Sequence, residues 1–235
     1  MKLLNLPFDG KPHRYLVFHP RRLPDGLQLA RTTTTEAFES VASSRFFLSR
    51  DGKILAKVVP DKFDKRQAPL KWLGRDYLEK RWLLQSDARK EFRSGRTLQR
   101  LGLSTPLYHG WGVSLNPANR NASLLLMEHI SDAQLGGEVF KAMSEQDRRG
   151  ILDRLCDQVA HIARNGYAAR DLHYNNLLVA DSGTLIWLDT HLRRLPHRRQ
   201  ARWAMIKNSL TAAKLGGETY RQHAEQRLRA LLGDK

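Results

Sequence analysis

The stretch that decides the fold runs from Arg170 to Asp189 and reads RDLHYNNLLVADSGTLIWLD. Asn176 follows Asp171 by five residues, and Asp189 follows Asp171 by 18. Two short apolar runs, separated by an Asp-Ser-Gly turn, lie between Asn176 and Asp189. Apolar runs on either side of such a turn are typical of a β-hairpin. The sequence therefore predicts a hairpin that brings Asp189 back beside Asp171 and Asn176.

These three polar residues match the layout of the catalytic loop in protein-kinase-like enzymes. In that layout Asp171 accepts the proton of the attacking hydroxyl, while Asn176 and Asp189 bind a magnesium ion that bridges the ATP phosphates. An Asp with an Asn five residues later also occurs in ordinary surface loops. The flanking apolar strands and the second Asp are therefore the stronger indications of a catalytic loop. The pattern predicts an ATP- and Mg²⁺-dependent kinase with Asp171 as the catalytic residue.

A kinase also needs a lysine that holds the α and β phosphates of ATP, and Lys57 fits this role. It lies in the apolar run 54–59, after an Asp-Gly turn that favours a second hairpin. Such a lysine needs an acidic partner on the following helix, which we expect over residues 88–101. Glu91 lies on this helix and is preferred to the earlier candidate, Glu79.

The expected secondary structure changes near residue 128, from mostly strands to mostly helices. We expect an α+β fold of two lobes, an antiparallel-sheet N-lobe (1–128) and a reduced helical C-lobe (129–235) that carries the catalytic loop and a short basic helical tail. Glu128 and His129 fall at the expected hinge, where backbone groups would bind the adenine of ATP. The other expected strands are 27–33, 45–48, 107–113, 122–127, 177–180 and 184–188, and the other expected helices are one beginning after the cap Ser144 and one or two over 202–232.

Five features of the chain together form a recognisable set: Lys57, the basic aromatic segment before ARKEF (88–92), LGLSTP (101–106), RDLHYNN (170–176) and LDTHLRR (188–194). With these features the chain resembles the lipopolysaccharide core kinase family, the Kdo/WaaP group, over about residues 45–215. The resemblance implies transfer of the ATP γ-phosphate to a heptose or Kdo hydroxyl of the lipopolysaccharide inner core, on a lipid-anchored acceptor at the cytoplasmic face of the inner membrane.

The chain departs from the kinase pattern at several points, among them Ala169, which stands where many kinases have a His before Arg-Asp. Thr190-His191 replaces the Phe-Gly pair that usually follows the metal-binding Asp, and no Gly-rich phosphate loop lies between residues 27 and 50. Backbone amides of the threonine run 32–35, or of Ser43-Ser44, would have to take the place of that loop. Only 46 residues follow Asp189, which favours a small or lipid-linked acceptor over a protein substrate.

The composition sets the wider limits. Lys and Arg total 40 against 24 Asp and Glu, a net charge of +16, which favours phosphate-rich partners. The single cysteine, Cys156, excludes a Cys-based zinc finger and is expected in the core. We find neither an apolar run long enough to span a bilayer nor a signal peptide, so a cytoplasmic protein is expected. The resemblance to the lipopolysaccharide core kinases implies that it is peripheral at the inner membrane. A basic run is expected to dock the anionic acceptor and the membrane surface: Arg193, Arg194, Arg198 and Arg199.

Several interpretations stay open at this stage. The aromatic residues Trp72, Tyr77 and Trp82 fit a membrane-facing or acceptor-facing surface and ordinary helix packing equally well. The whole chain also fits a pseudokinase or adaptor that binds a nucleotide or an anionic membrane without transferring phosphate. Nucleic-acid binding ranks third and is not expected, because no recognisable nucleic-acid module is present.

Overall fold

The computed structural model describes residues 1–8, 10–21, 23–24, 26–41, 43–189 and 191–233. The chain divides into two compact units. The first comprises Met1–Arg93 and Pro106–Ser131, and the second comprises Ser94–Thr105 and Asp132–Lys235.

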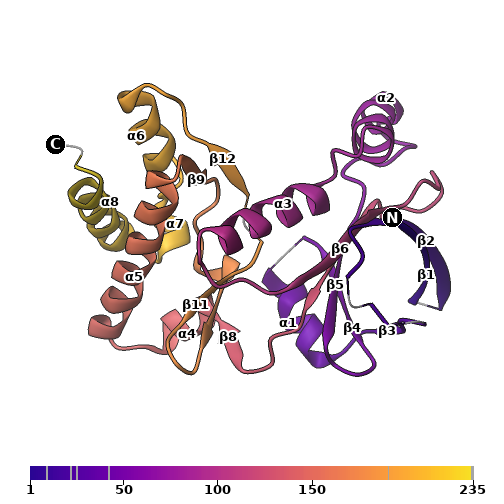
Figure 1. The fold of residues 1–235 in the computed structure, drawn as a ribbon, viewed down its shortest axis with the longest axis horizontal. Helices are drawn as coiled ribbons and strands as arrows, with labels where there is room; N and C mark the ends of the chain where they lie inside the picture. Colours follow the sequence, from indigo (N-terminus) through magenta and orange to yellow (C-terminus); the bar gives the residue numbers. More distant parts are fainter. Residues whose placement is uncertain (9, 22, 25, 42, 190, 234–235) are drawn as a thin grey trace. The chain divides into compact units, whose positions relative to one another are not determined.

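The first unit is built on a seven-stranded sheet in which every neighbouring pair is antiparallel (Figure 1). Its strand order is β1-β2-β6-β7-β5-β4-β3. The Asp51-Gly52 turn joins β4 to β5, and Gly52 has a φ of 71°, which a glycine adopts without strain. The strands are β1 (Lys2–Phe8), β2 (Lys11–Phe18), β3 (Leu29–Ala30), β4 (Arg45–Ser49), β5 (Ile54–Val59), β6 (Tyr108–Val113) and β7 (Ser123–Glu128).

Helix α3 (Asp87–Arg100) covers one face of this sheet. Its buried Ala88 and Phe92 pack against Leu55 of β5 and Met127 of β7. Because side chains alternate between the two faces of a strand, Lys57 lies on the same face as Leu55. The alternation of side chains along β5 therefore turns Lys57 towards helix α3. The unit also contains α1 (Thr33–Val41), α2 (Pro69–Lys71) and the π-helix η1 (Trp72–Trp82).

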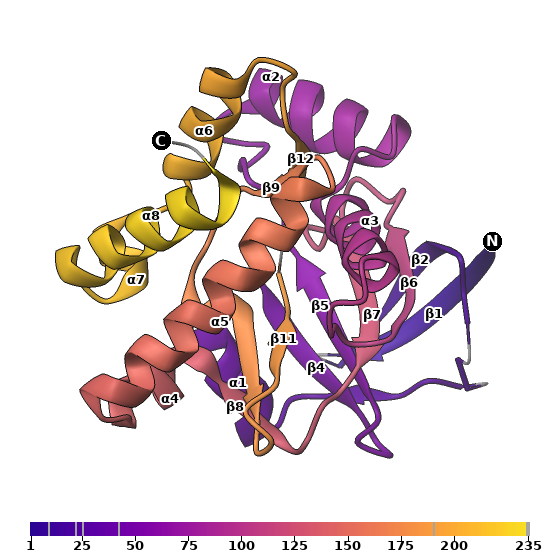
Figure 2. The same ribbon diagram turned by 60° about the vertical axis from the view of Figure 1, so that its left-hand side comes forward.

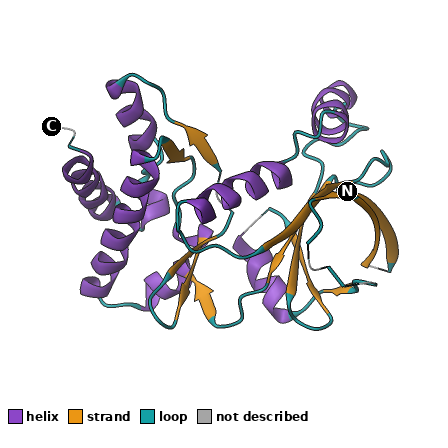
Figure 3. Cartoon of the chain, in the orientation of Figure 1, coloured by secondary structure: helices purple, strands orange, loops and turns teal. Residues whose placement is uncertain are grey.

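The second unit is mainly helical (Figure 3). Its long helix α5 (Glu145–Arg164) begins at the N-cap Ser144, whose hydroxyl accepts a hydrogen bond from Asp147 N, and α5 packs beside α8 (Glu218–Leu232; Figure 2). Cys156 is fully buried in this core, as expected. The other elements are β8 (Ala133–Leu135), α4 (Gly136–Ala142), β9 (Tyr167–Ala169), the 3₁₀ turn η2 (Tyr174–Asn176), β10 (Leu177–Ala180), β11 (Leu185–Trp187), β12 (Leu192–Arg194), α6 (Arg199–Lys207) and α7 (Ala212–Leu215).

The predicted fold class is confirmed: the chain is α+β, with an antiparallel sheet in the first unit and mostly helices in the second. The strand predicted over 27–33 is wrong except at Leu29–Ala30, because Thr33 already begins helix α1. Thr32 and Thr35 cap this helix reciprocally, each backbone N–H donating to the hydroxyl of the other. In the described part of the chain, no helix is long and apolar enough to cross a membrane.

Candidate functional site

Lys57 and Glu91, which the sequence predicts as a pair, meet in the first unit. The Lys57 Nζ lies 2.8 Å from Glu91 Oε2, and both side chains are almost fully buried. Lys57 comes from the middle of β5 and Glu91 from the first half of α3. A buried charge is costly unless it is paired, and each of these two side chains provides the other with its opposite charge. Such a pair fixes the lysine ammonium in one orientation, as a phosphate-binding lysine requires.

The loop that carries Asp171 is closed by its own asparagine. Asn176 Nδ2 donates a hydrogen bond of 3.1 Å to the Asp171 carbonyl oxygen. His173 supports the same turn, since its Nδ1 accepts a 2.9 Å hydrogen bond from Asn175 N. These bonds hold the backbone in a compact turn and leave the carboxylate of Asp171 exposed.

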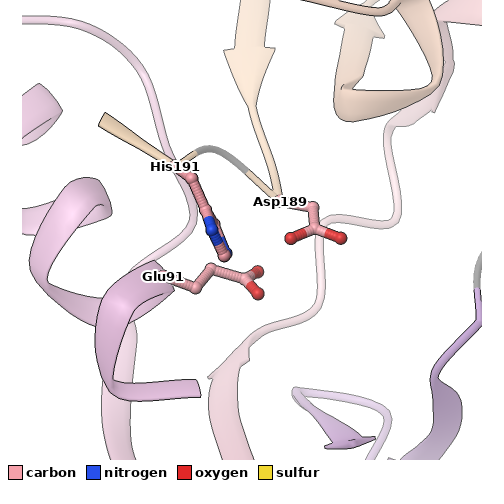
Figure 4. Close-up of side chains that lie close together, drawn as sticks. All are labelled: Glu91, Asp189 and His191. Carbon is pink, nitrogen blue, oxygen red and sulfur yellow. The ribbon is translucent and has the colours of Figure 1, made fainter. Parts of the chain in front are cut away.

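Asp189 is tied to both ends of this loop through its neighbours. Leu188 N donates to Asn176 O at 2.8 Å, and Arg170 N donates to His191 O at 2.9 Å. The hairpin predicted from the sequence is present, with β10 and β11 paired antiparallel. The structure therefore brings Asp171, Asn176 and Asp189 together in the second unit. Figure 4 shows the origins of the side chains, Glu91 on α3 and Asp189 and His191 after β11; Thr190 lies outside the described residues.

Asn176 and Asp189 offer the ligand chemistry that a magnesium ion prefers. Because Asn176 donates through Nδ2, its Oδ1 stays available as an acceptor, and the Asp189 carboxylate follows directly after the residue that is bonded to Asn176. Amide and carboxylate oxygens are the hard ligands of Mg²⁺. These two residues therefore fit a divalent-cation role.

One charged residue of the site, Lys214 of helix α7, does not follow from the sequence motifs. Its Nζ forms an ion pair with Asp171 Oδ1. Lys214 lies 43 residues beyond Asp171, so no local spacing signals the contact. The cation places positive charge at the carboxylate that the sequence predicts as the catalytic residue.

His173 stays uncharged beside this pair. Burial lowers its pKa below the usual value for histidine, which outweighs the opposite effect of Asp171, and Lys214 lowers it further. Its Nδ1 accepts a hydrogen bond and therefore carries no proton. His173 thus acts in the turn as a neutral acceptor.

The predicted hinge residues lie at the end of strand β7: Glu128 is its last residue, and His129 follows it. Their backbone N–H groups donate to Leu107 O and Lys53 O, both at 2.8 Å, so these two amides are occupied. Both residues line a hollow of about 820 Å³ in the first unit, together with Ile54. Ile54 belongs to the core cluster on the opposite face of the sheet from α3. The residues that line this hollow do not include Lys57 or Glu91, so the structure does not bring the predicted hinge together with that pair.

The four arginines predicted to dock an anionic partner are all exposed. Arg193 and Arg194 end β12, Arg198 is the N-cap of α6, and Arg199 is its first residue. The Arg199 side chain also donates to the Gly233 carbonyl oxygen. The run is therefore available to solvent along one connected segment.

Comparison with protein-family models and with curated proteins finds no match. Among solved structures, the chain is similar to WaaP in complex with acyl carrier protein, at 18% identity and a TM-score of 0.47, covering 86% of each chain. It is also similar to two structures of WbdD, a bifunctional kinase-methyltransferase, at 14% and 13% identity and TM-scores of 0.47 and 0.45. The matches cover 81% and 86% of this chain but only 43% and 44% of WbdD.

Proposed function

We propose that this protein is an ATP-dependent kinase that phosphorylates a sugar hydroxyl of the lipopolysaccharide inner core, a heptose or Kdo. The observation that carries the proposal is the loop in which Asn176 is bonded to the Asp171 carbonyl while Asp189 is held beside both. The buried Lys57–Glu91 pair supports it independently. The substrate class comes from the resemblance of the motifs to the lipopolysaccharide core kinases.

In this proposal each residue has a separate task. Lys57, held by Glu91, binds the α and β phosphates of ATP. Asn176 and Asp189 hold Mg²⁺, which neutralises charge on the transferred phosphate. Phosphoryl transfer leaves a protein mainly with positioning and charge stabilisation.

Asp171 then orients the acceptor hydroxyl and takes its proton as the oxygen–phosphorus bond forms. The bond between the γ-phosphorus and its bridging oxygen breaks, and ADP leaves with that oxygen. Lys214 remains beside the Asp171 carboxylate and fixes its orientation. The exposed Arg193, Arg194, Arg198 and Arg199 dock the anionic acceptor. The protein would work peripherally at the cytoplasmic face of the inner membrane.

The test is ADP release by purified protein with Mg²⁺, ATP and core oligosaccharide, compared between Asp171→Ala and a matched control. Asp181→Ala is that control, because Asp181 is an exposed aspartate in the β10–β11 turn of the same unit. We expect acceptor-dependent ADP release from the wild type and from the control, and loss by at least about a hundredfold in Asp171→Ala. Equal turnover by Asp171→Ala would contradict the role of this residue.

The adaptor function gives a different result in the same assay. A protein that binds ATP with Mg²⁺ but releases no ADP with any core oligosaccharide would be a nucleotide-binding adaptor, and the proposal of phosphoryl transfer would then be wrong.

A further inference from the structure

The segment formed by α2 and η1 buries charged side chains and exposes apolar ones, the reverse of the usual arrangement in a protein (for the segment, see the coil at α2 in Figure 1). Three charged side chains of η1 are buried: Asp76, Lys80 and Arg81. The exposed side chains include large apolar residues, among them Leu70 at 82% and Trp82 at 66% exposure. We call the five exposed apolar residues the outer face: Leu70, Leu73, Leu78, Trp82 and Leu83.

The buried charges fix which side of the helix faces inwards. Arg81 pairs with Asp61 at 2.7 Å and also donates to the carbonyl oxygen of Asn119 at 2.8 Å. Asp76 pairs with Lys80 at 2.8 Å and accepts two backbone N–H bonds from residues 62 and 63. Burial raises the pKa of Asp76, but the hydrogen bonds from Lys80 and the two amides outweigh it and lower the pKa. Because breaking these pairs would leave buried charges, the apolar side cannot turn inwards.

The π-helical winding aligns the outer face. A π-helix closes its turns with bonds between residues five apart, and Leu83 N donates to Leu78 O at 2.9 Å in this way. Leu73, Leu78 and Leu83 are spaced by five, so they lie on successive turns of one side. In an α-helix, residues five apart would point in directions about 140° apart. The winding therefore gathers into one strip side chains that an α-helix would scatter.

Two of the three aromatic residues left open by the sequence belong to the inner side. Trp72 and Tyr77 are half-buried and stack with ring centroids 5.4 Å apart, and the Trp72 indole donates to Asp61. Trp82 alone among them lies on the outer face. The aromatic segment thus combines ordinary packing with one exposed tryptophan.

Basic side chains lie in the same segment as this apolar strip. The cations of Lys62, Lys71 and Arg75 lie within 6.0 Å of the centre of the Phe63 ring. Lys65 and Arg66 are exposed in the same segment. The acidic side chains between residues 62 and 83, all of which the structure describes, are buried or half-buried. An apolar strip with a tryptophan and flanking cations matches a bilayer surface with anionic head groups.

We propose that the outer face of residues 69–83 inserts into the interface of an anionic lipid bilayer, with Lys71 and Arg75 on the lipid phosphates. The binding itself requires no phosphoryl transfer, while its biological purpose, to hold the enzyme beside a membrane-anchored acceptor, rests on the proposed function. The occupant is a bilayer rather than a second copy of this chain because the exposed charged side chains of residues 62–83 are all basic, so two identical surfaces would repel each other.

The test is co-sedimentation of the full chain with phosphatidylcholine vesicles that contain or lack phosphatidylglycerol. The variant Leu73→Gln/Leu78→Gln/Leu83→Gln removes the apolar strip, and Lys71→Gln/Arg75→Gln removes two cations. The control is Leu3→Gln, which changes an exposed leucine of β1 in the same unit. Circular dichroism verifies that each variant is folded.

We expect binding only to vesicles with phosphatidylglycerol. The leucine variant should lose at least about tenfold in partition coefficient, the cation variant should lose about thirtyfold, and Leu3→Gln should keep the wild-type value. Equal binding by the wild type and the folded leucine variant would overturn the proposal. The proposal would also be overturned if the wild-type protein failed to bind vesicles but formed dimers, and the leucine variant were a monomer. Turnover of soluble, delipidated core oligosaccharide should be unchanged in the leucine variant, so a failure of lipid binding is distinguishable from a failure of kinase activity.

Discussion

Removing either partner of the Lys57–Glu91 pair should destabilise the first unit strongly, whereas removing both should not. At 2.8 Å and an effective dielectric constant of about 20, the attraction between the two charges is roughly 6 kcal/mol. Desolvating the two ions costs several kcal/mol each, so the pair contributes little net stability. A single substitution removes the attraction but leaves the other charge buried. We therefore expect Lys57→Met and Glu91→Leu each to lower the free energy of unfolding by about 3–5 kcal/mol.

The double variant Lys57→Met/Glu91→Leu should lose much less than the sum of the two, because it leaves no buried charge. Urea unfolding followed by circular dichroism and tryptophan fluorescence measures all three. Arg120→Met is the matched control, since the Arg120–Asp64 pair of the same unit has an arginine that is 73% exposed; its cost should stay below about 1 kcal/mol. Single-variant costs below about 1 kcal/mol, or costs that simply add in the double variant, would refute the reasoning. A stable double variant that no longer binds ATP would separate the functional role of the pair from its structural one.

Three further predictions concern the second unit. The pKa of His173 is lower in the folded chain than in the unfolded chain, so as the pH falls the unfolded chain takes up a proton at this residue first. This contribution to stability is therefore present above about pH 6.5 and is lost as the pH falls through the folded pKa. The drop in urea midpoint between pH 7.5 and pH 5.5 should be smaller in His173→Asn than in the wild type, and an equal drop would contradict this prediction. Burial raises the pKa of Cys156 to about 12, and the charges of Asp153 and Asp157 add to the effect. A thiol-specific disulfide reagent at pH 8 should therefore label the native protein at least about a hundredfold more slowly than the urea-unfolded protein. Equal labelling rates would count against a buried thiol. Lys214→Met should lower kcat about 10- to 100-fold while the KM for ATP stays within about threefold, and steady-state kinetics with an unchanged kcat would exclude Lys214 from the site.

The parts of the fold that follow from local signals are predicted well. The Asp51-Gly52 turn specifies the β4–β5 hairpin, and the capping residue Ser144 marks the start of α5. The contact between Lys57 and Glu91 also follows from the sequence, because a strand residue and a helix residue with known roles in kinases leave few possible partners.

Other features depend on information that is weak or absent in the local sequence. The reciprocal caps of Thr32 and Thr35 are a helix-start signal, but the preceding apolar residues favour a strand and hide it. The π-helix has no apolar repeat at the α-helical period, so its outer face is invisible to a search for amphipathic α-helices. Lys214 reaches Asp171 only through the tertiary placement of the short helix α7, which ends at Gly216 with a φ of 82°.

The central claim is the transfer of phosphate from ATP to a core sugar with Asp171 as the base. Mass spectrometry of core oligosaccharide after incubation with Mg²⁺, ATP and enzyme tests it most directly. We predict one added phosphate on a heptose or Kdo with the wild type and with Asp181→Ala, and none with Asp171→Asn. Oligosaccharide that Asp171→Asn phosphorylates as fast as the wild type, or ADP that forms while no sugar gains a phosphate, would contradict the account.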